Sequence, residues 1–192
     1  MSSVPSARQA FIFTRQYSPK GLGDAVLCAK PVIGDSPFAV ILPDDLVDSP
    51  SSCIGELIAK REEKGGGNVV AVQNVPREKT NLYGIASVKA DAPESVTGLV
   101  EKPKPEEAPS TLAVIGRYVF EPSIFDYLEN VTPGAGGEIQ LTDAMEASLE
   151  SVPMTACRFS GRRFDCGSKQ GFITATVHYA KKAGFDTSGD AE

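Results

Sequence analysis

Short β-rich runs alternate with helix-like segments through roughly the first 75 residues, and this alternation restricts the fold more than any other feature of the sequence. β-branched and aromatic residues mark the strands, and Ser and Gly residues mark the ends of the helices. A strand–helix–strand order is typical of α/β proteins, in which helices cover a parallel sheet. The predicted strands cover 10–14, 38–42 and 68–73, and the predicted helices cover about 21–30 and 51–64.

The pattern changes between residues 83 and 120, where strands follow one another at 83–88, 98–102 and 112–120 without intervening helices. Such a block predicts some antiparallel pairing. We therefore expect an α/β fold with a Rossmann-like mixed, mainly parallel β-sheet flanked by helices. Further helices are predicted at 122–130, from about 138 and at 168–182, with a strand near 154–159.

The length of 192 residues lies within the usual size of one domain, and no linker divides the chain. We expect a single domain over 1–192, with a disordered tail at 184–192. The first ten residues lack the basic segment and apolar stretch of a secretory signal, and no apolar run approaches the roughly 20 residues that span a bilayer. These features predict a cytoplasmic protein without a membrane partner.

Charge and cysteine usage exclude further classes of function. The net charge of −6 argues against nucleic acid as the main partner, because a phosphate backbone needs a basic patch. The four cysteines show no C-x-x-C spacing, and a single histidine is present to join them, so a zinc site is not expected. Their apolar surroundings favour reduced, mostly buried thiols.

Gln16 and Gly21 lie between the first predicted strand and helix, where α/β sheets bind ligands. The Gln16 amide offers a donor and an acceptor together, which matches the imide edge of uracil. A glycine at 21 lets backbone approach a ring closely. The alternative is a solvated loop glutamine beside a glycine that the turn requires.

Asp44 ends an apolar strand, so its carboxylate should lie at the carboxyl edge of the sheet. This position suits a ligand of Mg²⁺, because magnesium prefers oxygen ligands and one or two carboxylates suffice beside phosphate oxygens. Asp165 is the natural second ligand, just before the last helix. Both aspartates are also compatible with a cap or turn role, and Asp45 is an adjacent alternative.

Glu101 and Lys102 are neighbours on a predicted strand, so their side chains should point to opposite faces and perform different tasks. Pro103 ends that strand. The alternative is an exposed charged pair at a strand end, and Lys104 is a competing cation for a phosphate.

Five short motifs occur in a fixed order, and each alone would be weak. They are RQ at 15–16 with KGLG at 20–23, ILPD at 41–44, VEKP at 100–103, GEIQLTD at 137–143, and FDCG at 164–167. Together they resemble the motifs of the bacterial UTP-glucose-1-phosphate uridylyltransferases, or UDP-glucose pyrophosphorylases, of the sugar nucleotidyltransferase family. The resemblance covers nearly the whole chain.

The resemblance implies a reaction of UTP with glucose 1-phosphate that forms UDP-glucose and pyrophosphate with the help of Mg²⁺. It assigns Asp44 and Asp165 to the metal and Lys102 to the sugar phosphate, as catalytic residues. Gln16 and Gly21 would bind the nucleotide. Residues on the sugar side would be Gly84, Glu101, Gly116, Tyr118 and Glu138.

Two of these sugar-side assignments have structural alternatives. Tyr118 is also compatible with a core position on an alternating strand. Glu138 is also favoured in a first helical turn by the helix dipole. Gly84 resembles the family position where the backbone approaches the hexose, and Gly116 resembles a position on another strand of the sugar side.

The sequence differs from the family's pattern at the start of the chain. The family's Gly-rich loop, with the Arg and Lys that hold the triphosphate, should precede residue 10, and nothing there matches it. We expect an N-terminally truncated domain with little or no turnover alone. A missing strand would leave a sheet edge uncovered, and we expect a homo-oligomer to cover it. Two other interpretations stay open: a non-catalytic module that binds sugar nucleotides or sugar phosphates, and an inert remnant that oligomerises.

Overall fold

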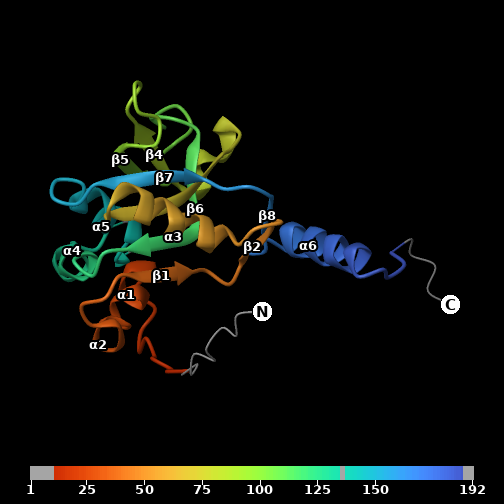
Figure 1. Cartoon of the computed structure of the whole chain (residues 1–192), viewed down its shortest axis with the longest axis horizontal. Coiled ribbons are helices and arrows are strands. Elements are labelled where there is room, and N and C mark those ends of the chain that lie inside the picture. The colour runs from red at the N-terminus through yellow and green to blue at the C-terminus, as the bar shows by residue number, and fades with distance from the viewer. Residues whose placement is uncertain (1–10, 135–136, 188–192) are drawn as a thin grey trace, which may run out of the picture.

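A six-stranded sheet forms the centre of the molecule in the computed structural model, which describes residues 11–134 and 137–187 (Figure 1). Its strand order is β5-β4-β6-β3-β7, with β1 also paired to β6. The longest strand, β6, is buried along almost its whole length because apolar residues occupy both of its faces. The strands are β1 (Phe38–Ile41), β3 (Asn68–Asn74), β4 (Gly84–Val88), β5 (Val96–Glu101), β6 (Leu112–Phe120) and β7 (Met154–Arg158).

The expectation of a mainly parallel sheet is not confirmed. Only β3 and β7 form a parallel pair in the described chain, and every other pairing is antiparallel. The strand–helix–strand unit of β1, α3 (Cys53–Lys64) and β3 does run its two strands in the same direction, but β6 lies between them and opposes both. The predicted unit is therefore present, and the insertion of β6 makes the sheet mixed with mostly antiparallel contacts.

Two apolar layers cover the two faces of the sheet, and alternate residues of β3 separate them. Val69 and Ala71 pack with Leu57 of α3, whereas Val70 and Val72 pack with the helices of the opposite face. Successive side chains of a strand point to opposite faces of the sheet, which explains this alternation. The helices of the second layer are α1 (Leu22–Leu27), α4 (Ile124–Asn130) and α5 (Leu141–Ser148), and the short α2 (Lys30–Ile33) follows α1.

Helix α3 begins and ends at the residues that its sequence indicates. The Ser52 side chain accepts a hydrogen bond from the Gly55 N–H at 3.2 Å, and Gly65 adopts the left-handed conformation at the other end. Of the four free cysteines, Cys53, the first residue of this helix, and Cys157 of β7 are buried in the same apolar layer. Burial raises the pKa of the Cys53 thiol to about 11, so the thiol stays protonated.

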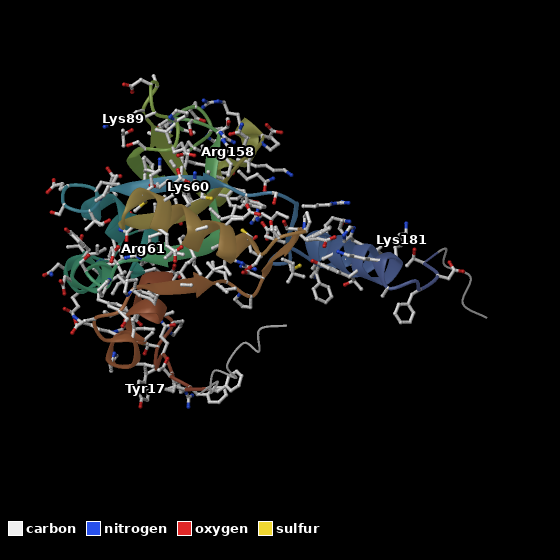
Figure 2. The ribbon with its side chains drawn as sticks, in the orientation of Figure 1. Tyr17, Lys60, Arg61, Lys89, Arg158 and Lys181 are labelled. Carbon is white, nitrogen blue, oxygen red and sulfur yellow. The ribbon has the colours of Figure 1, made fainter. Side chains whose placement is uncertain are left out.

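A second, two-stranded sheet, which the sequence pattern does not indicate, pairs β2 (Asp45–Asp48) with β8 (Arg162–Asp165). It leads into α6 (Lys169–Lys182), which extends away from the rest of the molecule (Figure 1). Lys181 lies near the outer end of this helix (Figure 2). The pattern also does not indicate the short 3₁₀ helix η1 (Arg77–Leu82) before β4.

The predicted strand at 10–14 is wrong over its described part, because residues 11–16 form neither helix nor strand. Phe11 and Phe13 are 82% and 93% exposed. A β-branched, aromatic run becomes a strand only when a partner supplies hydrogen bonds, and among the described residues β1 pairs with β6 alone. Ala10 lies outside the described residues.

The predicted tail lies partly within the described chain. Residues 185–187 form neither helix nor strand, and 188–192 lie outside the described residues. Among 11–134 and 137–187, no helix is both long and apolar enough to cross a membrane.

Candidate active site

A cleft of about 300 Å³ opens where β4, β5 and β6 meet the loop after β1 and the end of β8. This cleft gathers residues from all five sequence motifs, with Leu22 from the first, although up to 143 positions separate them. The predicted site residues that line it are Asp44, Gly84, Glu101, Lys102, Gly116, Tyr118 and Asp165.

Asp44 and Asp165 approach the same point beside Gly167. A Cβ atom placed on Gly167 would lie 3.1 Å from Asp44 Oδ2 and 3.2 Å from Asp165 Oδ1, so both oxygens flank a space that only a glycine leaves open. The Cys166 N–H donates to the Asp44 carbonyl at 2.7 Å and holds the two segments together. Two hard oxygen ligands around one small space fit a magnesium ion that keeps several waters.

The fit of this site to a magnesium ion depends on Asp44 and Asp165 alone. Within the described part of the chain, no three His, Cys, Asp or Glu side chains gather into a cluster that could hold a metal. Asp165 also stabilises the turn that follows it, since its Oδ1 accepts the Gly167 N–H at 3.2 Å. The turn role and the metal role, which the sequence left as alternatives, are therefore compatible in one side chain.

Asp45 is buried behind Asp44 and takes part in a different set of contacts. Its Oδ2 accepts the Gly116 N–H at 2.7 Å, and its Oδ1 accepts the Arg163 Nε–H. The Arg163 side chain is 8% exposed. Burial acts to lower the pKa of this guanidinium, but the hydrogen bond and charge of Asp45, together with the contact to Tyr83, raise the pKa overall. Asp45 is thus committed to an internal ion pair, which leaves Asp44 to face the cleft.

Tyr83 completes this group of contacts. Its hydroxyl donates to Asp165 Oδ2 at 2.9 Å, and the Arg163 guanidinium lies over its ring, 5.1 Å from the ring centre. Burial raises the pKa of the Tyr83 hydroxyl, which keeps the hydroxyl protonated and able to donate.

Glu101 and Lys102 do not point to opposite sides as expected. Lys102 Nζ lies 3.4 Å from Glu101 Oε1, and both side chains line the cleft. The reason is that β5 ends at Glu101 and the Lys102 backbone turns to φ 44°, in the left-handed region that non-glycine residues rarely adopt. The strand rule therefore fails at this residue, and the turn returns its ammonium group to the same site.

A second cavity of about 620 Å³ adjoins Glu101 and Lys102, and Glu138, Gln140 and Asp143 also line it. Glu138 lies before α5, which begins at Leu141, so the helix-dipole explanation of this glutamate is wrong. Burial, with a smaller effect of Glu101, raises the pKa of the Asp143 carboxyl. Glu138 therefore lines this second cavity and not the cleft that Asp44 and Asp165 border.

The comparison with protein families agrees with the motifs. The model of the family described as nucleotidyl transferase matches residues 7–182. The chain belongs to this family.

Relatives within the nucleotidyl transferase family support the more specific resemblance. The chain is 47% identical over 169 residues to a UTP-glucose-1-phosphate uridylyltransferase from Pseudomonas aeruginosa, covering 86% of the chain and 61% of the relative. It is 50% identical over 171 residues to the one from Komagataeibacter xylinus, covering 88% and 56%. The chain thus spans less than two thirds of the length of these curated relatives.

Solved structures agree in fold. A UDP-glucose pyrophosphorylase complexed with UDP-glucose is 39% identical with a TM-score of 0.85, over 90% of this chain and 66% of that one. A UTP-bound enzyme of the same type from Acinetobacter baumannii is 41% identical with a TM-score of 0.75, over 86% and 58%. The predicted α/β class and the resemblance to this group of nucleotidyl transferases are confirmed.

Two glycines of this nucleotidyl transferase chain also have structural explanations. A Cβ on Gly116 would lie 2.7 Å from Leu42 Cβ, where the loop after β1 crosses β6. A Cβ on Gly84 would lie 2.8 Å from Thr142 Oγ1. Tyr118 is a core residue that also borders the cleft: it is buried against Phe120, with ring centres 5.3 Å apart.

Gln16 and Gly21 do not line the cleft. The Gln16 side-chain N–H groups donate to the Gly21 carbonyl at 3.1 Å and to Asp24 at 2.6 Å. Gly21 has φ 97° and lies against Glu138 and Ile139, where a Cβ would meet the Ile139 carbonyl at 2.7 Å. Both residues are held at the start of α1, whose first residue, Leu22, borders the cleft.

Sequence reasoning missed several residues of the cleft that lie within or beside the motifs. Gln140 and Thr142 belong to the fourth motif, and Thr142 Oγ1 donates to Glu101 Oε2 at 2.6 Å. Tyr83 precedes Gly84, and Arg163 precedes the fifth motif. For Arg163, the only signal in the sequence was a charged residue next to a motif. Its burial depends on the pairing of β2 with β8, which the sequence pattern does not indicate.

Proposed function

We propose that this chain binds UDP-glucose, UTP and glucose 1-phosphate and takes part in the transfer that forms UDP-glucose and pyrophosphate with Mg²⁺. The observation that carries the proposal is the shared space beside Gly167, where Asp44 and Asp165 meet at one end of a cleft that also holds Lys102 and Glu101. The relatives named for this reaction and the solved complexes with UDP-glucose and UTP support it.

Each side chain of the cleft has a separate task in this proposal. Asp44 and Asp165 would hold Mg²⁺, and the ion, when bound, would offset charge on the phosphates. Lys102 pairs with the phosphate of the sugar. Because its side chain is 55% exposed and its ammonium group lies 3.4 Å from Glu101, it can exchange this contact for a phosphate oxygen without breaking a buried ion pair.

The sugar side is assigned to Glu101, with Gly84, Gly116, Tyr118 and Glu138 nearby. Glu101 accepts a hydrogen bond from Thr142 through Oε2, so its remaining acceptor capacity can receive sugar hydroxyls. The chemistry then consists of alignment: the phosphate oxygen of glucose 1-phosphate attacks the α-phosphorus of UTP as pyrophosphate leaves. No covalent intermediate with the protein is required.

Gln16 and Gly21 remain our prediction for contact with the uracil base. The hydrogen bond from Gln16 to Gly21 fixes the amide at the start of α1, beside the edge of the cleft at Leu22. Replacing Gln16 by Leu should weaken UTP binding more than glucose 1-phosphate binding.

The single domain, the cytoplasmic location and the homo-oligomer are further parts of the proposal. Among the described residues, β1 pairs on one side alone, and Ile41 on this strand is 53% exposed. We propose that a second copy covers this edge. Light scattering should give the mass of a dimer or larger assembly, and a well-behaved monomer would show this proposal to be wrong.

Two measurements test the proposed activity. Titration calorimetry with UDP-glucose, UTP and Mg²⁺ should show binding that Asp44→Asn and Asp165→Asn weaken in the presence of metal. A pyrophosphate-release assay with UTP and glucose 1-phosphate measures turnover. Binding without turnover would favour the non-catalytic module, and the absence of any binding heat would refute the proposal.

A further inference from the structure

The two carboxylate oxygens of Asp165 have different surroundings. Oδ1 faces the space beside Gly167 opposite Asp44. Oδ2 accepts the Tyr83 hydroxyl at 2.9 Å and lies 3.4 Å from an Arg163 guanidinium nitrogen. Oδ2 is thus held by Tyr83 and Arg163, while Oδ1, which also accepts the Gly167 N–H at 3.2 Å, faces Asp44.

Arg163 is itself fixed from several directions. Asp45 accepts its Nε–H, and Asp45 is fixed in turn by the Gly116 N–H of β6. The guanidinium also lies 3.4 Å from the Tyr83 hydroxyl oxygen. A buried guanidinium with its carboxylate partner defines a single arrangement, because any displacement would leave a charge unpaired in the interior.

Tyr83 joins this group from a different part of the molecule. It lies between η1 and β4 in the main sheet, whereas Asp165 ends β8 in the small sheet. The β2–β8 pair has its own backbone register, with Asp45 opposite Asp165, and does not need the Tyr83 hydroxyl to form. The hydrogen bond therefore orients the Asp165 side chain rather than holding the strands together.

We propose that Tyr83 and Arg163 are positioning residues that hold Asp165 with Oδ1 facing Asp44, and so preorganise the two carboxylates for a divalent cation. This inference rests on the proposed function, since it concerns the metal ligands assigned there. Partners that orient a metal ligand typically contribute about 10–100-fold to metal affinity.

The test is a Mn²⁺ titration followed by electron paramagnetic resonance, with the full chain, in the absence and presence of UDP-glucose. Tyr83→Phe removes one hydroxyl and keeps the ring under Arg163. We expect it to raise the dissociation constant for Mn²⁺ about tenfold. Arg163→Lys should weaken binding by a similar or larger factor, because a lysine cannot contact Asp45, Asp165 and Tyr83 together.

Matched controls separate positioning from general destabilisation. Tyr127→Phe changes a half-buried tyrosine of α4, and Arg61→Lys changes an arginine of α3 that pairs with Glu121 at 2.6 Å, outside the cleft. Both controls should bind Mn²⁺ as the unchanged chain does. Thermal unfolding of each variant accompanies the titration. If Arg163→Lys does not fold, Tyr83→Phe decides the question.

The outcomes distinguish this inference from the proposed function. Weaker Mn²⁺ binding by Tyr83→Phe, with thermal unfolding close to that of the unchanged chain, supports the positioning role. Unchanged Mn²⁺ affinity in Tyr83→Phe, beside a clear loss in Asp44→Asn, overturns the positioning role and leaves the metal site intact. If the unchanged chain and Asp44→Asn bind Mn²⁺ equally, the metal assignment is wrong and the inference is wrong with it.

Discussion

At the scale of single residues, the cleft depends on a side chain that is absent as much as on those that are present. Gly167 leaves open the space between Asp44 and Asp165, and a methyl group there would lie just over 3 Å from both carboxylates. Gly167→Ala should therefore lower the affinity for Mg²⁺ or Mn²⁺ about tenfold or more. Its effect on stability should be within about 1 kcal/mol, because Gly167 is exposed.

The control for this prediction is Gly98→Ala. A Cβ on Gly98 would meet its nearest neighbour at 3.8 Å, which is an ordinary contact, and Gly98 does not border the cleft. Metal affinity should not change in this variant. Equal metal affinities in the two alanine variants would contradict the role of Gly167, and calorimetry or spin resonance measures both.

Lys102 provides the second prediction at this scale. Lys102→Met should weaken binding of glucose 1-phosphate or UDP-glucose about 10–100-fold, because a hydrogen bond from a charged group contributes about 1.5–3 kcal/mol. Lys104→Met is the matched control, since Lys104 pairs with Glu107 at 3.3 Å and does not line the cleft. Calorimetry that finds Lys104→Met the weaker binder would assign the phosphate to Lys104 instead.

At the scale of elements, the side chains of Asp48 and Phe164 attach α6 to the small sheet. Asp48 of β2 accepts from His178 Nε2 at 2.6 Å and from Lys182. The ring of Phe164 lies 4.7 Å from that of His178. Hydrogen bonds, first from Lys182 and then from His178, lower the pKa of Asp48 from its ordinary value of 3.8.

This lowered pKa predicts how pH affects α6. Asp48 contributes its stabilisation fully above pH 3.8, and the contribution disappears as the pH falls through the lower pKa of the folded state. Asp48→Asn should therefore speed hydrogen exchange of the α6 amides at pH 7 relative to the unchanged chain, and the difference should fade as the pH falls from 3.8 through the lower pKa of the folded state. Asp126→Asn on α4, whose side chain is 74% exposed, should leave α6 exchange unchanged. A difference that persists once Asp48 is protonated would mean that the carboxylate charge is not responsible.

At the scale of the whole molecule, two apolar layers share one sheet, which predicts one cooperative unfolding unit. Leu57 of α3 lies in one layer at 0% exposure, and Leu128 of α4 lies in the other at 1%. Leu57→Ala and Leu128→Ala should each lower the free energy of unfolding by about 2–5 kcal/mol. Both should shift the same transition in urea, followed by circular dichroism.

The neighbouring residue Ile58 is the control for Leu57, because it lies on the same helix and is 43% exposed. Ile58→Ala should cost less than about 1 kcal/mol. Two separate transitions, each sensitive to one of the two leucine substitutions, would contradict a single cooperative domain.

Interactions between residues close together along the chain decided which segments form most of the helices and strands. The amino-acid pattern predicts these segments well. Strand β6 occupies the predicted residues 112–120, and α3 ends at Gly65 as its sequence indicates. Caps, apolar periodicity and glycines act locally, so no knowledge of the partner is needed. The motifs likewise identified Asp44, Lys102 and Asp165 as residues of one cleft.

Packing between segments far apart in the sequence decided which strands lie next to one another and which side chains meet. Strand β6 lies between β1 and β3, and β2 pairs with β8 across more than 110 residues, so neither the mostly antiparallel sheet nor the buried Arg163–Asp45 pair is visible in the local pattern. The run at 10–14 has the composition of a strand, yet its described part forms none. A strand forms only when pairing with a second segment and burial against it lower the free energy, so the composition of one segment is not sufficient.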